Sequence, residues 1–201
     1  TQLLRGQNAD GSWKAGGQLP AQKRPARETQ EVSTAWAAIA LLDSKADQAI
    51  SADDQAAAVD KAVAKARKWL GDAKDAESVE WWVTRMMLER ALGNARQAQQ
   101  GRSAILAAQH DDGGWGWRLD EPSDAFGTSL ALYGLLRDGL DPASESLRRA
   151  VRFLHQTQRK DGTWLVHGTK KNGRNEEVET AVYWGAAWAA IAALEWLDQT
   201  S

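Results

Sequence analysis

The sequence predicts an all-α fold built from about four repeated helical hairpins arranged around an axis. Two observations predict it. A short turn motif recurs along the chain, and the segments between its copies carry apolar residues at helical spacing. The motif reads Gln-x-x-Asp-Gly-[Ser/Gly/Thr]-Trp and begins at Gln7, Gln109 and Gln158. Its spacing corresponds to a unit of about 50 residues, with one degenerate copy between Gln7 and Gln109.

Each motif copy combines a glutamine, an Asp-Gly pair and a tryptophan. The Asp-Gly pair predicts a tight turn, because glycine tolerates positive φ and aspartate can bond the backbone ahead of it. The motif residues are Gln7, Asp10, Gly11, Trp13, Gln109, Asp112, Gly113, Trp115, Gln158, Asp161, Gly162 and Trp164.

The segments that follow the motif also repeat. The hexapeptide Ala-Trp-Ala-Ala-Ile-Ala occurs at 35–40 and again at 187–192, and residues 127–136 align with 33–42. The degenerate copy is residues 83–88, which follow Trp81-Trp82 but lack the Asp-Gly turn. Each unit therefore pairs an outer helix before the turn with an inner helix after it.

The first half of the chain supplies two such pairs. Residues 1–7 read as the end of an outer helix, and 31–43 is apolar on nearly every side, which is typical of a buried inner helix. A one-sided helix is expected over 51–70, with Ser51 as its N-cap. The second inner helix is expected over 77–92, where Gly93-Asn94 ends it.

The second half repeats this order. An outer helix over 95–109 leads into the second motif, and Pro122-Ser-Asp124 opens an inner helix that extends to residue 137. The outer helix 143–158 has apolar residues at a period of about 3.6. The last inner helix is expected over 177–197. It is long enough to cross a bilayer, but Glu179 and Glu195 within it favour a buried inner helix over a membrane span.

Composition restricts the function classes. The chain of 201 residues carries a net charge of −2 and no cysteine. It is long enough for a single domain with a substantial core, residues 1–201. The charge does not favour nucleic acid or an anionic membrane as a partner. The missing cysteine excludes disulfides, thiolate metal sites and thioester chemistry. No feature indicates a cofactor, because neither a glycine-rich phosphate loop nor a Gly-x-Ser-x-Gly motif is present, and the compartment stays open.

The repeated motif resembles the QW repeat of squalene-hopene and oxidosqualene cyclases. The resemblance covers essentially the whole chain and rests on the three motif copies and on the Thr-Ala or Thr-Ser starts of the inner helices. It implies an α/α toroid of the terpenoid-cyclase and prenyltransferase type, with inner helices around a central cavity. It also implies that the motif glutamine and tryptophan tie neighbouring outer helices together, a structural role. A toroid of six units would need about 300 residues, so two arrangements are expected. One is an incomplete ring that exposes apolar faces at both ends, the helix at 31–43 at one end and Trp184, Trp188 and Trp196 at the other. The other is a tighter ring of four inner helices that closes on itself.

The same resemblance argues against cyclase catalysis by this chain. Those cyclases protonate an alkene with an aspartate in Asp-x-Asp-Asp-Thr-Ala at an inner-helix start. The proton-donor position falls on Val32, Phe126 and Val178 here, and none of these can donate a proton. We therefore identify no catalytic residue. Related prenyltransferases use zinc, but this chain has no cysteine and its three histidines lie in different repeats, so no metal site is expected.

A polar rim is the remaining candidate site. The loops 14–30, 116–121 and 165–175 each link an outer helix to an inner one, so they are expected to gather at one end of the ring. Loop cations such as Lys23 and Arg24 would meet acids there; solvated loops and helix N-terminal acids are the simpler interpretation. The alternative is a polar mouth over a tryptophan-lined cavity. The candidate residues are Glu31, Trp36, Asp124, Tyr133, His167, Glu177, Glu179, Trp184 and Trp188.

Two classes of function follow. The first is a non-catalytic module that binds an apolar or sugar-like small ligand or another protein. Its protein partner would be the rest of a larger polypeptide, or a second copy that associates through open toroid ends. The second is an enzyme: a divergent terpenoid cyclase or prenyltransferase-type enzyme completed by further repeats, or a toroid that acts on polysaccharide.

Overall fold

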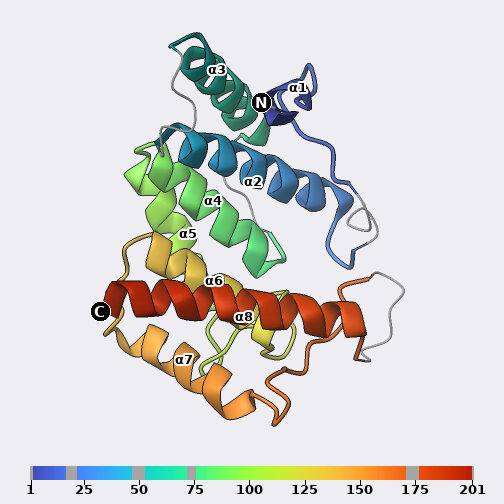
Figure 1. The fold of residues 1–201 in the computed structure, drawn as a ribbon, viewed down its shortest axis with the longest axis vertical. Coiled ribbons are helices and arrows are strands. Elements are labelled where there is room, and N and C mark those ends of the chain that lie inside the picture. The colour runs from blue at the N-terminus through green and yellow to red at the C-terminus, as the bar shows by residue number, and fades with distance from the viewer. Residues whose placement is uncertain (1, 17–21, 47–52, 72–75, 171–176, 201) are drawn as a thin grey trace.

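In the computed structural model the chain is all-helical, which confirms the predicted fold class (Figure 1). The structure describes residues 2–16, 22–46, 53–71, 76–170 and 177–200, and no strand occurs within these ranges. The helices are α1 (Gln2–Arg5), α2 (Ala26–Ala46), α3 (Asp53–Leu70), α4 (Val79–Ala91), α5 (Ala95–Ala107), α6 (Ala125–Arg137), α7 (Glu145–Thr157) and α8 (Glu179–Thr200). Over the same ranges, no helix has the length and apolar character that a membrane crossing requires.

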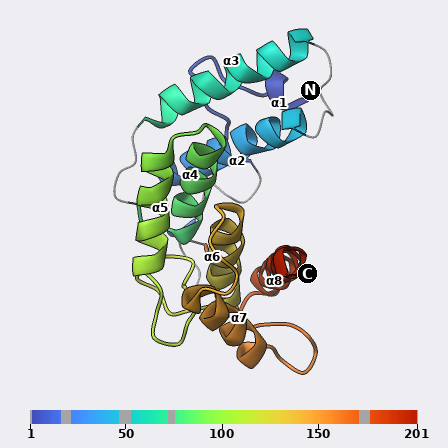
Figure 2. The same ribbon diagram turned by 90° about the vertical axis from the view of Figure 1, so that its left-hand side faces the viewer.

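The helices alternate between an inner and an outer layer, as an α/α toroid requires. The inner helices α2, α4, α6 and α8 pack in sequence order, each against the next. Figure 2 shows them as an open arc, with α3, α5 and α7 on its outer side. Each of these outer helices packs against the inner helix that precedes it in the chain.

Small residues let the helices approach closely. A Cβ atom on Gly134 of α6 would lie 2.6 Å from Cγ1 of Val83 of α4. A Cβ atom on Gly101 of α5 would lie 2.8 Å from Cβ of Met86, also of α4. Neither position has room for a side chain, so α5 and α6 can pack this closely against α4 only because both residues are glycine.

The three turn motifs adopt the same local structure. In each, the aspartate carboxylate accepts a hydrogen bond from the backbone N–H two residues ahead: Ser12, Gly114 and Thr163. Each tryptophan Nε1 donates to a carbonyl ten residues earlier, on Leu3, Ile105 and Leu154. The motif glycines have positive φ of 99°, 90° and 85°, a conformation that glycine adopts without strain.

The two ends of the arc differ. We expected the helix at 31–43 to present an unsatisfied apolar face, but α2 is largely buried because it packs against α3 and α4. Its Trp36 also reaches Trp188 of α8, with ring centroids 5.8 Å apart. In α8, by contrast, only Gly185, Ala189 and Ala192 are buried. Among the described residues, exposed large apolar side chains gather on α8, where they are Tyr183, Trp184, Ile191, Leu194 and Leu197.

Candidate functional site

The described parts of the three loops predicted to form a rim meet where the inner helices begin. The backbone N–H of Lys23 donates to the carbonyl of Thr169 at 2.8 Å, and its Nζ pairs with Glu121 at 3.0 Å. The loop at 116–121 also bonds to the start of α4, because the N–H of Val79 donates to the carbonyl of Trp117 at 3.0 Å. The rim is thus built from segments far apart in the sequence.

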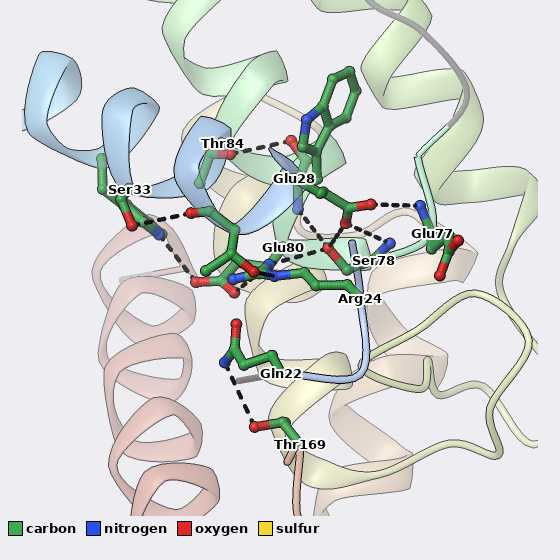
Figure 3. A network of polar contacts seen from close by, with 12 residues as sticks. Gln22, Arg24, Glu28, Ser33, Glu77, Ser78, Glu80, Thr84 and Thr169 are labelled. Carbon is green, nitrogen blue, oxygen red and sulfur yellow. Dashed lines mark hydrogen bonds and ion pairs between the residues drawn. The ribbon is translucent and has the colours of Figure 1, made fainter. Parts of the chain in front are cut away.

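Arg24 lies at the centre of this rim, although the sequence predicted a solvated loop cation. It is 3% exposed, and its guanidinium lies over the ring of Trp117, 5.0 Å from the centroid. It donates to Ser78 Oγ at 3.1 Å and pairs with Glu80 at 2.8 Å (Figure 3). Because a planar guanidinium can donate to several acceptors at once, Arg24 holds the loop before α2 against the start of α4.

Glu28 is the second buried charge of the rim. One carboxylate oxygen accepts from the N–H of Glu77 at 3.0 Å, and the other accepts from the N–H and hydroxyl of Ser78 (Figure 3). Ser78 is the N-cap of α4 and also accepts from the N–H of Trp81. The start of α2 is therefore bonded directly to the start of α4.

Two further carboxylates of the rim hold tryptophans. Glu31 accepts from Trp81 Nε1 at 2.7 Å and pairs with Arg27 at 2.8 Å. Glu80 accepts from Trp36 Nε1 at 3.2 Å. Because donors of the protein already bond to the carboxylate oxygens of Glu31 and Glu80, neither side chain is well suited to act as a general acid or base.

An aromatic cluster adjoins the rim, because Trp36 Nε1 donates to Glu80, and it joins three inner helices. It consists of Trp36 of α2, Tyr133 of α6 and Trp188 of α8. The ring of Trp188 lies 5.8 Å from that of Trp36 and 5.6 Å from that of Tyr133, measured between centroids. All three are partly buried, and burial raises the pKa of the Tyr133 hydroxyl.

The other candidate residues do not join this cluster. Trp184 is 52% exposed, and its ring lies edge-on to that of Tyr183, so it is not one of the partly buried rings of the cluster. Glu177 is exposed and pairs with Arg159 at 2.7 Å. Glu179 is exposed, and His167 is partly buried beside Glu177 in an isolated backbone bridge. Glu177 and His167 thus lie together where the loop before α8 meets the start of that helix.

Asp124 is the most perturbed carboxyl group of the site. It is the N-cap of α6 and accepts from the N–H of Gly127 at 2.7 Å. Burial raises its pKa to about 7, although the hydrogen bonds from Gly127 and Phe126 oppose the shift. At neutral pH it is therefore divided between its acid and its carboxylate forms. Nothing in the sequence pattern distinguished it from an ordinary cap.

At the positions where the cyclase acid would lie, the structure places apolar side chains. Val32 is buried, and Phe126 and Val178 are partly buried. In the part of the chain that the structure describes, no three His, Asp or Glu side chains converge in a way that could hold a metal ion.

Comparisons with known proteins give partial matches. Drimenyl diphosphate synthase of Streptomyces showdoensis is 35% identical over 74 residues, which is 37% of this chain and 14% of that protein. Labda-7,13-dienyl diphosphate synthase of Streptomyces clavuligerus is 35% identical over 66 residues, or 32% of this chain and 12% of that protein. The chain is similar to terpene cyclases over about a third of its length.

Two further comparisons limit what this similarity shows. An alpha-2-macroglobulin of Thermotoga maritima is 32% identical over 71 residues, or 34% of this chain and 5% of that protein. No protein-family model matches the chain. The matched stretch is a small part of each relative. The similarity therefore does not assign the activities of these relatives to this chain.

Proposed function

We propose that this chain is a terpenoid-cyclase-like toroid module that binds an apolar, isoprenoid-like ligand without transforming it. The observation that carries the proposal is the state of the acids at the inner-helix starts. Glu28, Glu31 and Glu80 are engaged by donors of the protein, and Asp124 caps a helix. Alkene protonation needs a strong, available acid, and these groups do not supply one.

The aromatic cluster supplies the binding surface. Trp36, Tyr133 and Trp188 present ring faces and edges from three inner helices, and aromatic side chains contribute large apolar contact areas. The similarity to enzymes that make drimenyl and labdadienyl diphosphates favours an isoprenoid chain as the ligand class. A ligand seated there would contact the rings and lie beneath the charged rim.

The binding experiment is calorimetric titration of the chain with farnesol and with farnesyl diphosphate. We expect saturable binding that Tyr133→Leu weakens at least several-fold. The matched control is Tyr183→Leu, which should leave the affinity unchanged, because Tyr183 is 69% exposed and its ring pairs with that of Trp184. Equal effects of the two substitutions would contradict binding at the cluster.

Product analysis decides between this module and an enzyme. Incubation with squalene or with farnesyl diphosphate should return the starting material unchanged. Val178→Asp alone should not create activity, because the acid also needs a shaped, closed cavity. Any cyclic product from the wild-type chain would overturn the non-catalytic proposal and favour a divergent cyclase.

A further inference from the structure

The aromatic cluster has carboxylates on more than one side. At the rim, Glu80 accepts a hydrogen bond from Trp36 Nε1 at 3.2 Å. Burial raises the pKa of the Tyr133 hydroxyl, and the negative charges of Glu195 and Asp43 raise it further. These two carboxylates therefore lie within electrostatic range of Tyr133. A ligand that lies along the rings brings its head group towards a carboxylate whichever way round it binds.

The lysines and arginines of the rim loops, where the structure describes them, are either paired with acids or exposed. The ion pairs, with N–O distances of 2.8 to 3.2 Å, are Arg24–Glu80, Lys23–Glu121, Arg27–Glu31 and Arg118–Glu77. Lys14 and Lys170 are exposed, where water and salt weaken their attraction for an anion. The rim therefore offers an anionic ligand little compensation from its cations.

The charges of the rim that are shielded from solvent are mostly negative. Glu28 is 6% exposed and forms no ion pair with a described residue, because its donors are the backbone of Glu77 and Ser78 and the Ser78 hydroxyl (Figure 3). The described rim groups that are not exposed are the cations Lys23, Arg24 and Arg118 and the carboxyl groups of Glu28, Glu31, Glu80, Glu121 and Asp124. An anionic head group would thus enter a region of like charge, which is costly.

The unused hydrogen-bonding capacity of the rim is uncharged. Buried atoms without a partner in the described part of the chain include Gln22 Oε1 and Trp117 Nε1. Gln22 precedes the buried Arg24 by two residues, and the Trp117 ring lies against the Arg24 guanidinium. Native proteins satisfy nearly all buried polar atoms. An amide oxygen accepts and an indole N–H donates, and a hydroxyl group can serve both.

We propose that the ligand of the aromatic cluster carries an uncharged polar head group, the hydroxyl of an isoprenoid alcohol, and that the surrounding carboxylates exclude the corresponding diphosphate. This rests on the proposed function, because it concerns the ligand of the same site. The isoprenoid chain contacts the rings, and its hydroxyl donates to a carboxylate oxygen, which an ionised diphosphate cannot do. Glu80 is the main specificity-determining residue, since it bonds to Trp36, and Glu121 adds to its effect.

The test is calorimetric titration with farnesol and with farnesyl diphosphate, in EDTA so that no divalent cation neutralises the diphosphate. We expect farnesol to bind at least about tenfold more tightly, because like charges oppose the diphosphate. Raising the ionic strength from about 0.01 to about 0.1 M should strengthen diphosphate binding and leave farnesol binding unchanged, since the screening length falls from about 30 to about 10 Å.

Substitution of the carboxylates tests their role. Glu80→Gln removes a charge beside the cluster and keeps an acceptor for Trp36, so it should reduce the preference for farnesol several-fold. Glu121→Gln should act in the same direction and replaces it in the test if Glu80→Gln does not fold. The control is Glu145→Gln at the exposed start of α7. It changes the net charge equally and should leave the preference unaltered.

The outcomes separate this inference from the proposed function. If neither ligand binds in a way that Tyr133→Leu weakens, the ligand site itself fails and this inference fails with it. If both bind at the cluster and the diphosphate binds as tightly as farnesol, the head-group inference is overturned while the ligand site stands. A preference that Glu80→Gln and Glu121→Gln change no more than Glu145→Gln does also overturns it.

Discussion

The carboxyl group of Asp124 is subject to two opposing influences at the start of α6. As an N-cap it accepts the N–H of Gly127, which stabilises the charged form. Its burial favours the neutral form more strongly and raises its pKa to about 7. A group whose pKa is higher in the folded than in the unfolded state contributes stability below the unfolded pKa. That contribution is lost as the pH rises through the folded pKa.

Asp124→Asn should therefore flatten the dependence of stability on pH. The wild-type free energy of unfolding should fall between pH 5 and 8 by up to about 1.4 kcal/mol per pH unit relative to the variant. Asparagine keeps the capping oxygen, so the variant should fold normally. Urea denaturation at pH 5, 6.5 and 8 measures the difference.

Asp161→Asn is the control, because Asp161 is exposed and its pKa is lowered by hydrogen bonds from Thr163. The same slope in wild type and Asp124→Asn would contradict this assignment.

The motif tryptophans should differ in the stability that they contribute. Trp115 is completely buried and donates to the carbonyl of Ile105 at 2.7 Å, whereas Trp164 makes the same bond from a half-buried position. Trp115→Ala should cost about 3–5 kcal/mol of unfolding free energy. Trp164→Ala should cost roughly half of that, since less apolar area is lost. Denaturation midpoints measure both, and equal losses would show that the third motif is as fully packed as the second.

At the scale of helices, buried carboxylates join neighbouring repeats near both the N-terminal and the C-terminal ends of the inner helices. At the rim, Glu28 of α2 accepts from the backbone at the start of α4. Near the C-terminal ends of α4 and α6, Asp138 pairs with Arg90 at 2.6 Å and also with Arg102. A buried carboxylate that accepts several bonds is costly to remove, because its donors are left without partners.

Glu28→Ala should therefore destabilise the fold by about 2–4 kcal/mol, since the N–H groups of Glu77 and Ser78 lose their acceptor. Glu28→Gln keeps an acceptor oxygen and should cost clearly less. The control is Glu145→Ala at the exposed start of α7, which should change stability by less than about 0.5 kcal/mol. Chemical denaturation at neutral pH ranks the three variants. A Glu28→Ala loss no larger than that of Glu145→Ala would exclude the bridging role.

The helices were predictable from the sequence because their ends depend on local signals. Helices α4 to α7 lie within three residues of the predicted ranges, since residues such as Ser78 and Gly93 act on the adjacent turn. Helix α2 begins at Ala26 rather than at 31, directly after Pro25. Proline fixes φ at a value suited to a helix start.

The polar core of the rim was not predictable in this way. Arg24 and Ser78 are 54 residues apart in sequence, and a run of loop cations looks the same whether it is solvated or buried. The exposure of Trp184 was not predictable for a related reason. Helix α8 is apolar on every side, so its pattern does not tell which side faces the aromatic cluster. The burial of Arg24 and the exposure of Trp184 depend on contacts between segments far apart in the sequence, which the local pattern does not show.

At the scale of the whole molecule, neighbours decide how firmly each repeat is held. Helices α4 and α6 are enclosed by inner helices on both sides, and α8 is held by α6 and by the ring contacts of Trp188. Repeat architectures distribute stability through contacts between nearest neighbours, so a terminal unit opens more readily than a central one. The ring contact between Trp36 and Trp188 joins α8 to α2 in addition to its packing on α6, so we expect it to add to the stability of α8.

Trp188→Ala should loosen α8 selectively. Aromatic pairs contribute about 0.5–1.5 kcal/mol each beyond their buried area, so the loss of the contacts with Trp36 and Tyr133 should speed amide hydrogen exchange in α8 by roughly tenfold. Exchange in α4 should stay near its wild-type rate, because its own neighbours are unchanged. Mass spectrometry of peptides from the two helices measures both. Trp184→Ala, a loss of the same residue type from the exposed face of the same helix, should leave α8 protected. If both substitutions speed exchange in α8 equally, the Trp36–Trp188 contact does not hold the arc together.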